Sequence, residues 1–227
     1  MNKKKLTYKN YNSMIRKILL MSAGIIFSGM YSQQTRFGLK AGYTYSNFNS
    51  NIETANEKFE PKSGYYAGLS AEKRLSEKLA TQVEAIYANL GSQTTYENAG
   101  VTVKQINQLH RLVVPVSLKY NVTYELGVLA GGYLSSKISN NVKFKTSGDI
   151  GVTDEELKEL EKEYKKYLDD NLKSTELGVQ FGIDYRAFKS VYIEARYSLG
   201  LSSMIKNPAN DEKLTMSFLQ AGIGYKF

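Results

Sequence analysis

The chain has 227 residues, a formal net charge of +8 and a mean hydropathy of -0.39, with 18 Tyr, 9 Phe and 18 Gly. The complete lack of Cys excludes a disulfide framework, a thiol nucleophile, a thiolate metal site and lipid attachment through Cys. The composition is typical of a turn-rich β protein, and the negative hydropathy is compatible with a membrane barrel, whose strands alternate lipid-facing and interior residues.

The first segment, residues 1–32, is typical of a cleaved export signal. Lys and Arg residues without any acid precede an apolar core, residues 18–30, which is too short to span a bilayer as a helix. We expect cleavage after Ser32, which leaves a domain over residues 33–227; the alternative is an uncleaved anchor helix. Removing residues 1–32 lowers the formal charge from +8 to about +2, because six of the positive charges and no acid lie there. The basic character therefore gives little support for nucleic-acid binding.

Period-two alternation of apolar residues with polar or very small ones predicts eight strands. In chain order they are residues 35–47, 64–74, 79–90, 105–120, 124–136, 174–187, 191–201 and 214–227. In the last of them, Leu219, Ala221, Ile223, Tyr225 and Phe227 form one apolar face. The strands indicate an all-β domain in which every strand has one apolar and one polar or small face.

The predicted connections alternate between long and short. They are residues 48–62, 76–78, 91–104, 121–123, 140–173, 189–190 and 202–213. An even strand count with this alternation predicts an eight-stranded antiparallel up-and-down transmembrane β-barrel, with short periplasmic turns and long extracellular loops. Pro115 removes a hydrogen-bond donor from the fourth strand, so we expect a bulge or a local break there.

On this topology the aromatic residues gather at two levels. The predicted periplasmic girdle is Phe37, Tyr120, Tyr124, Tyr185, Tyr225 and Phe227. Towards the outer rim lie Tyr43, Tyr45, Tyr65 and Tyr87. Two girdles are expected of a barrel in a bilayer, and a soluble eight-stranded barrel would have no reason to produce them.

The longest connection, residues 140–173, is charged and contains a predicted helix. Thr153 and Glu156 have the spacing of a capping box. Leu157, Leu160, Tyr164, Leu168 and Leu172 then recur at helical spacing over about five turns. This apolar stripe suits a partner helix or the lipid headgroup layer. The alternative, which we favour, is a lid that folds over the barrel's own mouth.

Charged residues occupy the interior face of the predicted barrel. They are Lys40, Glu72, Arg74, Glu84, Arg111, Lys119, Glu125, Glu176, Asp184, Arg186, Glu194, Arg196 and Lys226. They suit a gated polar path or a site for a charged ligand. The alternative, which we favour, is a structural salt-bridge network, because eight strands leave room only for side chains and unpaired buried charge is costly.

No constellation of residues suggests catalysis, a cofactor or a metal. His110 is the single histidine. Barrels that deacylate surface lipids carry His-x-Ser on a strand, whereas here Arg111 and Leu112 follow. The glycines alternate within strands and form no phosphate-binding loop. We therefore expect a protein without enzymatic activity or cofactor, with His110 as a polar group at the membrane interface.

Four strand motifs resemble the Bacteroidetes-type outer-membrane β-barrel family, often described as PorT-like. They are residues 37–42 (FGLKAG), 114–120 (VPVSLKY), 194–201 (EARYSLGL) and 222–227 (GIGYKF). The resemblance covers residues 33–227, apart from the charged insert at 140–173. It implies the outer membrane of a Gram-negative bacterium, and one branch of the family resembles a factor needed for the secretion of exported proteins.

We expect a structural or surface-interaction role for such a protein. An accessory role in secretion and the binding or transport of a small ligand are the alternatives. The expected partners are outer-membrane lipid, periplasmic chaperones and the barrel-assembly machinery during biogenesis, and a protein at the extracellular loops. Nucleic acid is not expected as a partner, and the protein is expected to be a monomer.

Overall fold

A computed structural model describes residues 35–51, 59–98, 101–147, 153–208 and 211–227. The export signal predicted over residues 1–32 lies outside these ranges. The described strands are β1 (Thr35–Ser50), β2 (Glu60–Arg74), β3 (Leu79–Asn98), β4 (Val101–Asn121), β5 (Leu126–Ser147), β6 (Thr175–Arg186), β7 (Val191–Gly200) and β8 (Leu214–Lys226).

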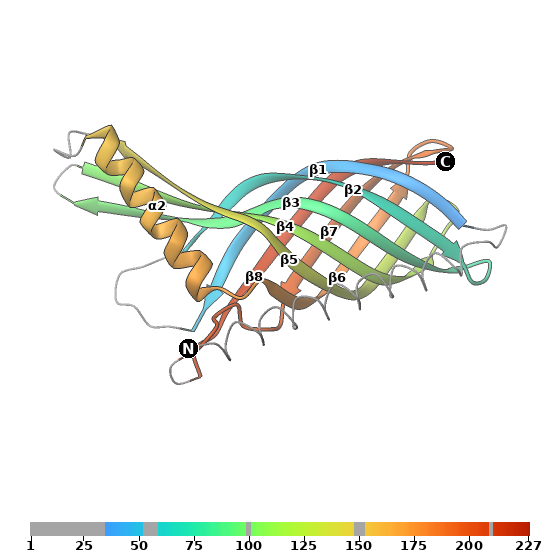
Figure 1. The fold of residues 1–227 in the computed structure, drawn as a ribbon. Coiled ribbons are helices and arrows are strands. Elements are labelled where there is room, and N and C mark those ends of the chain that lie inside the picture. The colour runs from blue at the N-terminus through green and yellow to red at the C-terminus, as the bar shows by residue number, and fades with distance from the viewer. Residues whose placement is uncertain (1–34, 52–58, 99–100, 148–152, 209–210) are drawn as a thin grey trace. The chain divides into compact units, whose positions relative to one another are not determined.

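The eight strands form one closed antiparallel barrel in which each strand pairs with its neighbours in sequence (Figure 1). β1 and β8 close the ring in a register that runs from Gly38 opposite Lys226 to Ser50 opposite Leu214. Closure leaves no open sheet edge along this seam, which is a condition for a sheet in lipid. The predicted fold class is confirmed.

Alternation sorts the side chains as the sequence predicts. In β7, Tyr192, Glu194, Arg196 and Ser198 are buried in the interior, while the residues between them face outwards. The outward face of the barrel is apolar and aromatic, as expected where strands contact hydrocarbon.

Three strands continue past the others and form an extension, which we call the arm: residues 94–98, 101–110 and 137–147 of β3, β4 and β5 (Figure 1). Pairing of β2 with β3 ends at Gln93, and pairing of β5 with β6 ends at Ser136. The predicted loops at residues 91–104 and from residue 140 onwards are therefore wrong in part. The buried face of the arm carries polar side chains such as Thr94, Gln105 and Asn107, so apolar alternation fades while backbone pairing continues.

Pro115 interrupts one ladder without shifting it. In the described strands, β3 pairs with β4 at Val83–Val116 and again at Ile86–Val113, in the same register and with no pair between. The register shift lies instead between His110 and Arg111, on the β5 side. The expected local break is present, but the bulge expected at Pro115 is not, because the missing donor costs only the bonds to β3.

The predicted helix is confirmed as α2 (Asp154–Asn171), 18 residues or five turns long. Its capping box is formed: the Glu156 backbone N–H donates to the Thr153 hydroxyl at 3.4 Å, and the Thr153 backbone N–H donates to the Glu156 carboxylate at 2.8 Å. At its other end, Lys206 donates to the carbonyls of Asp169 and Asp170. Among the described residues, no helix combines the length and apolarity needed to cross a membrane.

Thr153→Ala should weaken the first turn of α2 by about 0.5–2 kcal/mol, because the Glu156 backbone N–H loses its acceptor. Amide hydrogen exchange should quicken in residues 154–157, with little change in the barrel strands. Thr153→Ser retains the hydroxyl and serves as the control. Equal protection in Thr153→Ala and the wild type would remove the stabilising role of the cap.

The cap should also depend on pH. The backbone N–H and hydroxyl of Thr153 donate to Glu156 and lower its pKa. A lowered pKa means that ionised Glu156 stabilises α2 above its unfolded pKa, and that this contribution is lost as the pH falls through the lower folded value.

Candidate functional site

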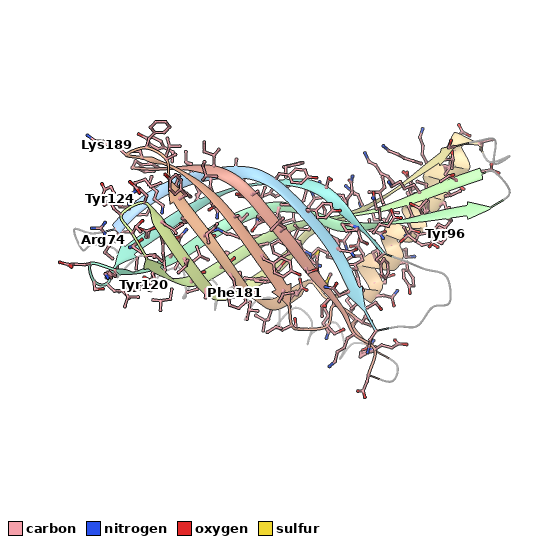
Figure 2. All side chains as sticks on the ribbon, turned by 180° about the vertical axis from the view of Figure 1, so that it is seen from behind. Arg74, Tyr96, Tyr120, Tyr124, Phe181 and Lys189 are labelled. Atoms are coloured by element: carbon pink, nitrogen blue, oxygen red, sulfur yellow. The ribbon has the colours of Figure 1, made fainter. Side chains whose placement is uncertain are left out.

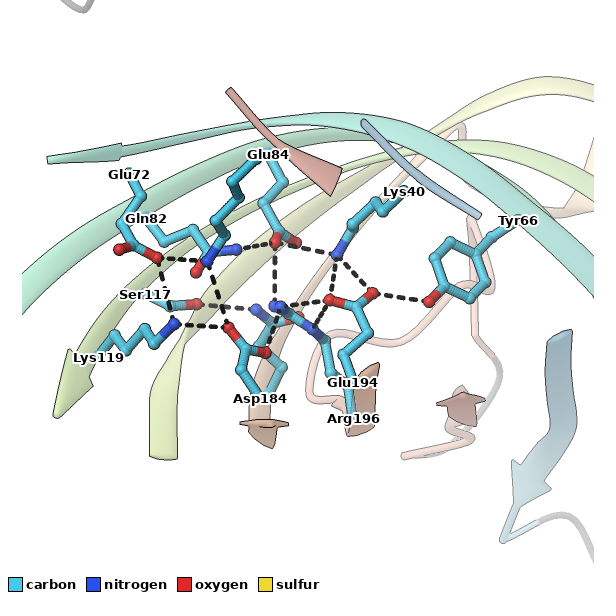
Figure 3. Close-up of polar contacts among 12 residues, drawn as sticks. Lys40, Tyr66, Glu72, Gln82, Glu84, Ser117, Lys119, Asp184, Glu194 and Arg196 are labelled. Carbon is cyan, nitrogen blue, oxygen red and sulfur yellow. Dashed lines mark hydrogen bonds and ion pairs between the residues drawn. The ribbon is translucent and has the colours of Figure 1, made fainter. Parts of the chain in front are cut away.

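The barrel interior contains a network of ion pairs centred on Arg196 (Figure 3). Its guanidinium lies 2.7 Å from Glu194, 3.1 Å from Glu84 and 3.2 Å from Asp184. Lys40, on β1, is separated from β7 by β8 alone and lies 2.9 Å from both Glu84 and Glu194. Each of these two glutamates therefore bridges the same two cations.

The network continues towards the end of the barrel that carries the short turns. Asp184 contacts Lys119 at 2.8 Å and Lys226 at 3.8 Å. Glu72 contacts the same two lysines at 3.2 Å and 2.6 Å. The chain of contacts thus runs from Lys40 through Arg196 and Asp184 to Lys226, and it joins β1, β2, β3, β4, β6, β7 and β8.

Within the described interior these contacts pair four cations with four carboxylates, so their formal charges cancel. Arg196, Lys40, Glu84 and Glu194 are almost completely buried. Each carboxylate lies within 4 Å of at least two cations, which offsets the cost of its removal from water. The arrangement fills and cross-links this half of the interior.

Glycines make room for a tyrosine that joins the network. Tyr66 donates to Glu194 at 2.6 Å, and its ring passes over Gly42 and Gly222, which are paired across the β1–β8 seam. A Cβ atom at Gly42 would collide with that ring, and one at Gly222 with the Tyr66 hydroxyl. Alternation with very small residues is visible in the sequence of these strands, but the contact with Tyr66 is visible only in the structure.

Beyond the network, the outer half of the interior contains an apolar cluster with buried polar side chains beside it. We call this cluster the plug: Phe48, Tyr66, Ile86, Ala88, Leu90, Leu109, Val113, Tyr133, Val142, Leu168, Leu172, Met204, Met216 and Phe218. Met204 comes from the connection between β7 and β8, where its backbone bonds to Leu214 and Lys173 hold it inside. The predicted polar loop 202–213 therefore contributes a core residue. The signal in the sequence for an apolar cluster inside the barrel was the presence of apolar residues at inward positions, such as Ile86, Leu90 and Val113.

Arg111 and Glu176 are buried beside the plug without a direct ion pair. Arg111 donates to the Ser174 carbonyl at 3.4 Å, and Glu176 accepts from the Met216 backbone at 3.0 Å. The structure thus separates these two predicted interior charges from the network around Arg196, and each is held mainly by backbone groups.

Three other predicted interior charges lie at the end of the barrel that carries the short turns. Arg74 and Glu125 are exposed, and Arg186 is partly exposed with its guanidinium 4.5 Å from the centre of the Tyr124 ring. The expectation that they face a filled interior is wrong for Arg74 and Glu125. Both positions keep the inward phase of their strands but lie at or just beyond the strand ends, where the interior opens to water.

The aromatic residues lie on the outer surface at the two expected levels. Figure 2 shows Tyr120 and Tyr124 at the end that carries Arg74 and Lys189. Phe37 stacks with Phe227 at the same end, with ring centroids 6.5 Å apart. The side chains of Phe37, Tyr120, Tyr124, Tyr185, Tyr225 and Phe227 are all exposed.

Towards the other end, Tyr43, Tyr45 and Tyr65 are exposed. The ring centroids of Tyr65 and Tyr87 are 6.1 Å apart. The Tyr87 hydroxyl is 2.6 Å from Nδ1 of His110, and the two rings stack. The single histidine therefore lies on the outward face beside an aromatic group, away from the interior charges. Within the described ranges, no group of His, Asp or Glu is placed to hold a metal ion.

Helix α2 lies along the arm (Figure 1). Tyr164 packs edge-on against Phe144 of β5, and Glu161 accepts the backbone N–H of Phe144 at 3.0 Å. Asp169 accepts from Lys137 at 2.8 Å and from Asn140 at 3.1 Å. α2 therefore covers the free edge of β5.

The predicted apolar stripe of α2 is divided between two environments. Leu168 and Leu172 enter the plug, Leu157 is half-buried, and Leu160 and Tyr164 are 43% and 40% exposed. The lid interpretation applies only to the C-terminal end of α2, where Leu168 and the C-cap residue Leu172 pack into the plug. The rest of the helix lies against the arm and not over the mouth.

Solved structures with a similar fold are outer-membrane barrels. Neisserial surface protein A is 16% identical, with a TM-score of 0.45, over 84% of this chain and 97% of that one. The attachment invasion locus protein Ail of Yersinia pestis is 9% identical, with a TM-score of 0.42, over 86% and 100%. OprG of Pseudomonas aeruginosa is 15% identical, with a TM-score of 0.39, over 86% and 96%. At this similarity they support no statement about activity.

No curated protein matches the chain. A family model described as "Outer membrane protein beta-barrel domain" matches residues 31–206, which is most of the sequence. That match agrees with the closed barrel of eight strands, the apolar outward face and the two aromatic levels. The chain belongs to the outer-membrane β-barrel domain family and is an outer-membrane protein.

Proposed function

We propose that this protein is a non-enzymatic outer-membrane barrel that presents the arm and α2 to the cell exterior as an interaction surface. The observation that carries the proposal is the packing of α2 on the arm through Phe144, Glu161 and Asp169. These contacts make one folded unit from three strands and a helix. A pre-ordered surface loses less conformational entropy on binding than mobile loops do.

The exposed part of α2 offers a chemical basis for binding. Leu160, Tyr164 and Tyr167 follow one another on one side of the helix, and Tyr167 is 63% exposed. Tyrosine combines apolar area with a hydroxyl and is enriched at the centre of protein interfaces. We propose a protein partner for this surface.

Leu160→Glu/Tyr167→Glu should abolish attachment that depends on this protein. Cells of a non-adherent laboratory strain that express the wild type should attach to host-cell monolayers or matrix-coated surfaces, and the double variant should fall to the level of cells with an empty vector. Lys166→Glu changes charge on another side of α2 and should attach like the wild type. Equal attachment by all three strains at matched surface expression would contradict the proposal.

A second candidate function, an accessory role in protein secretion, rests on the PorT-like resemblance of the strand motifs, and a Bacteroidetes origin rests on the same motifs. It predicts that deletion of the gene abolishes export of specific cargo. Normal secretion in the deletion strain would remove this candidate.

Transport of a small ligand through the barrel is less well supported, since ion pairs and the plug fill the described interior. We expect no conductance in planar bilayers. We also propose that residues 1–32 are a cleaved export signal, that periplasmic chaperones and the barrel-assembly machinery act during biogenesis, and that the protein is a monomer.

A further inference from the structure

The end of the barrel that carries the short turns has two adjacent cavities, of about 350 Å³ and about 280 Å³. Arg186, Tyr124 and Asn121 line both of them. Short turns mark the periplasmic end in this class of barrel, so both cavities face the periplasm. We call the two together the periplasmic mouth.

Cations outnumber carboxylates in the lining of the mouth. Lys119 and Lys226, at its floor, are already paired with Glu72 and Asp184. The remaining charged lining residues are the cations Arg36, Arg74, Lys78, Arg186 and Lys189 and the carboxylates Glu77 and Glu125. This leaves an excess of three positive charges, and a carboxylate on Phe227 would still leave two. Within the described chain none of these five cations has an ion pair.

The phase of the strands decides what these cations face. Arg36 lies in phase with Lys40 on β1, Arg74 with Glu72 on β2, and Arg186 with Asp184 on β6. Alternate residues point to the same side of a strand, so these three continue the inward-facing rows. They are directed at the aqueous mouth, whereas the girdle aromatics Phe37 and Tyr185, next to Arg36 and Arg186 in the chain, face outwards.

Arg186 occupies the position between the two cavities. Its guanidinium lies 4.5 Å from the centre of the Tyr124 ring, and this cation–π contact leaves its N–H donors at the rim free for another acceptor. A guanidinium with free N–H donors is suited to bidentate contact with a carboxylate or phosphate group.

We propose that the periplasmic mouth is a binding site for a small, multivalent oxyanion that carries phosphate or carboxylate groups and is dissolved in the periplasm. The cations at its rim are unpaired and face water, the floor is closed by the ion-pair network, and the larger cavity has the size of a small-molecule site. This site is independent of the surface-interaction role of the arm.

Pyrophosphate is a suitable probe, with the protein in nanodiscs of zwitterionic phosphatidylcholine. We expect saturable binding by the wild type in calorimetry, and affinity at least about tenfold lower in Arg186→Gln/Lys189→Gln, because two charged donors are lost. Lys143→Gln/Lys145→Gln removes two lysines from the arm and should bind like the wild type. Resistance to denaturation in cold gel electrophoresis checks that each variant is folded.

A second measurement separates a dissolved anion from a lipid headgroup. The Nε signal of Arg186 in NMR spectra should shift on addition of pyrophosphate, and should not shift when phosphatidylglycerol replaces part of the phosphatidylcholine. A shift with phosphatidylglycerol alone would assign the mouth to lipid headgroups and overturn the proposal. Absence of saturable binding, or an equal loss of affinity in the arm variant, would overturn it as well.

Discussion

Replacement of Arg196 by Met should lower the free energy of unfolding of the barrel by about 3–5 kcal/mol. Arg196 is fully buried and is shared by Glu84, Asp184 and Glu194. Without it, these carboxylates keep only lysine partners, and excess negative charge remains in the interior. The chain contains no Trp, so unfolding in urea is best followed by gel mobility and circular dichroism of protein in phosphatidylcholine vesicles.

Three variants control this result. Arg196→Lys keeps the charge but cannot reach three carboxylates in the same way, so its stability should be intermediate. Arg196→Met/Glu194→Gln removes one carboxylate with the cation and should recover part of the loss. Arg74→Met removes an arginine that also has the inward phase of its strand but is exposed at the periplasmic mouth. It should change the free energy of unfolding by less than about 0.5 kcal/mol. Arg196→Met that unfolds at the wild-type urea concentration would show that the network adds nothing to stability.

Phe218→Ala should cost about 3–5 kcal/mol of unfolding free energy, because it leaves a cavity in the plug. The Phe218 ring is 1% exposed and packs edge-on against Tyr133, with centroids 5.6 Å apart. The same urea titration measures the loss. Conductance in planar bilayers then tests whether the plug closes the barrel, since the wild type should be silent.

Phe181→Ala is the matched control, because Phe181 is 53% exposed on the outward face of β6. Lipid chains can fill the space that its ring leaves, so the loss should be clearly smaller than for Phe218. Equal losses for the two variants would mean that the plug is not packed as a core.

Alternation of apolar and polar residues by itself determined the barrel. Strand count, the inward and outward faces, the seam between β1 and β8 and the five turns of α2 all follow from local periodicity. Each strand in lipid must keep one apolar face and satisfy its backbone in a closed sheet, so the pattern is strict between the two girdles.

Outside the girdles that constraint ends, and the local pattern of residues predicted the strand ends and the loops less well. Residues 94–98 and 101–104 were expected to be loop but pair as strands, because β3 and β4 continue their ladder in water. The burial of Met204, from a connection expected to be polar, depends on contacts with distant segments at Lys173 and Leu214.

The interior shows the same division. The sequence placed thirteen charges on one face, but only the tertiary structure decided their partners. Arg196 and Asp184 meet because β6 and β7 are neighbours, and Lys40 reaches Glu84 past the single intervening strand β2. Arg74 lies at the end of β2, two residues beyond Glu72, and does not join them. Periodicity gives the side of a strand that a residue faces. The curvature and stagger of the closed sheet give its depth and its partner.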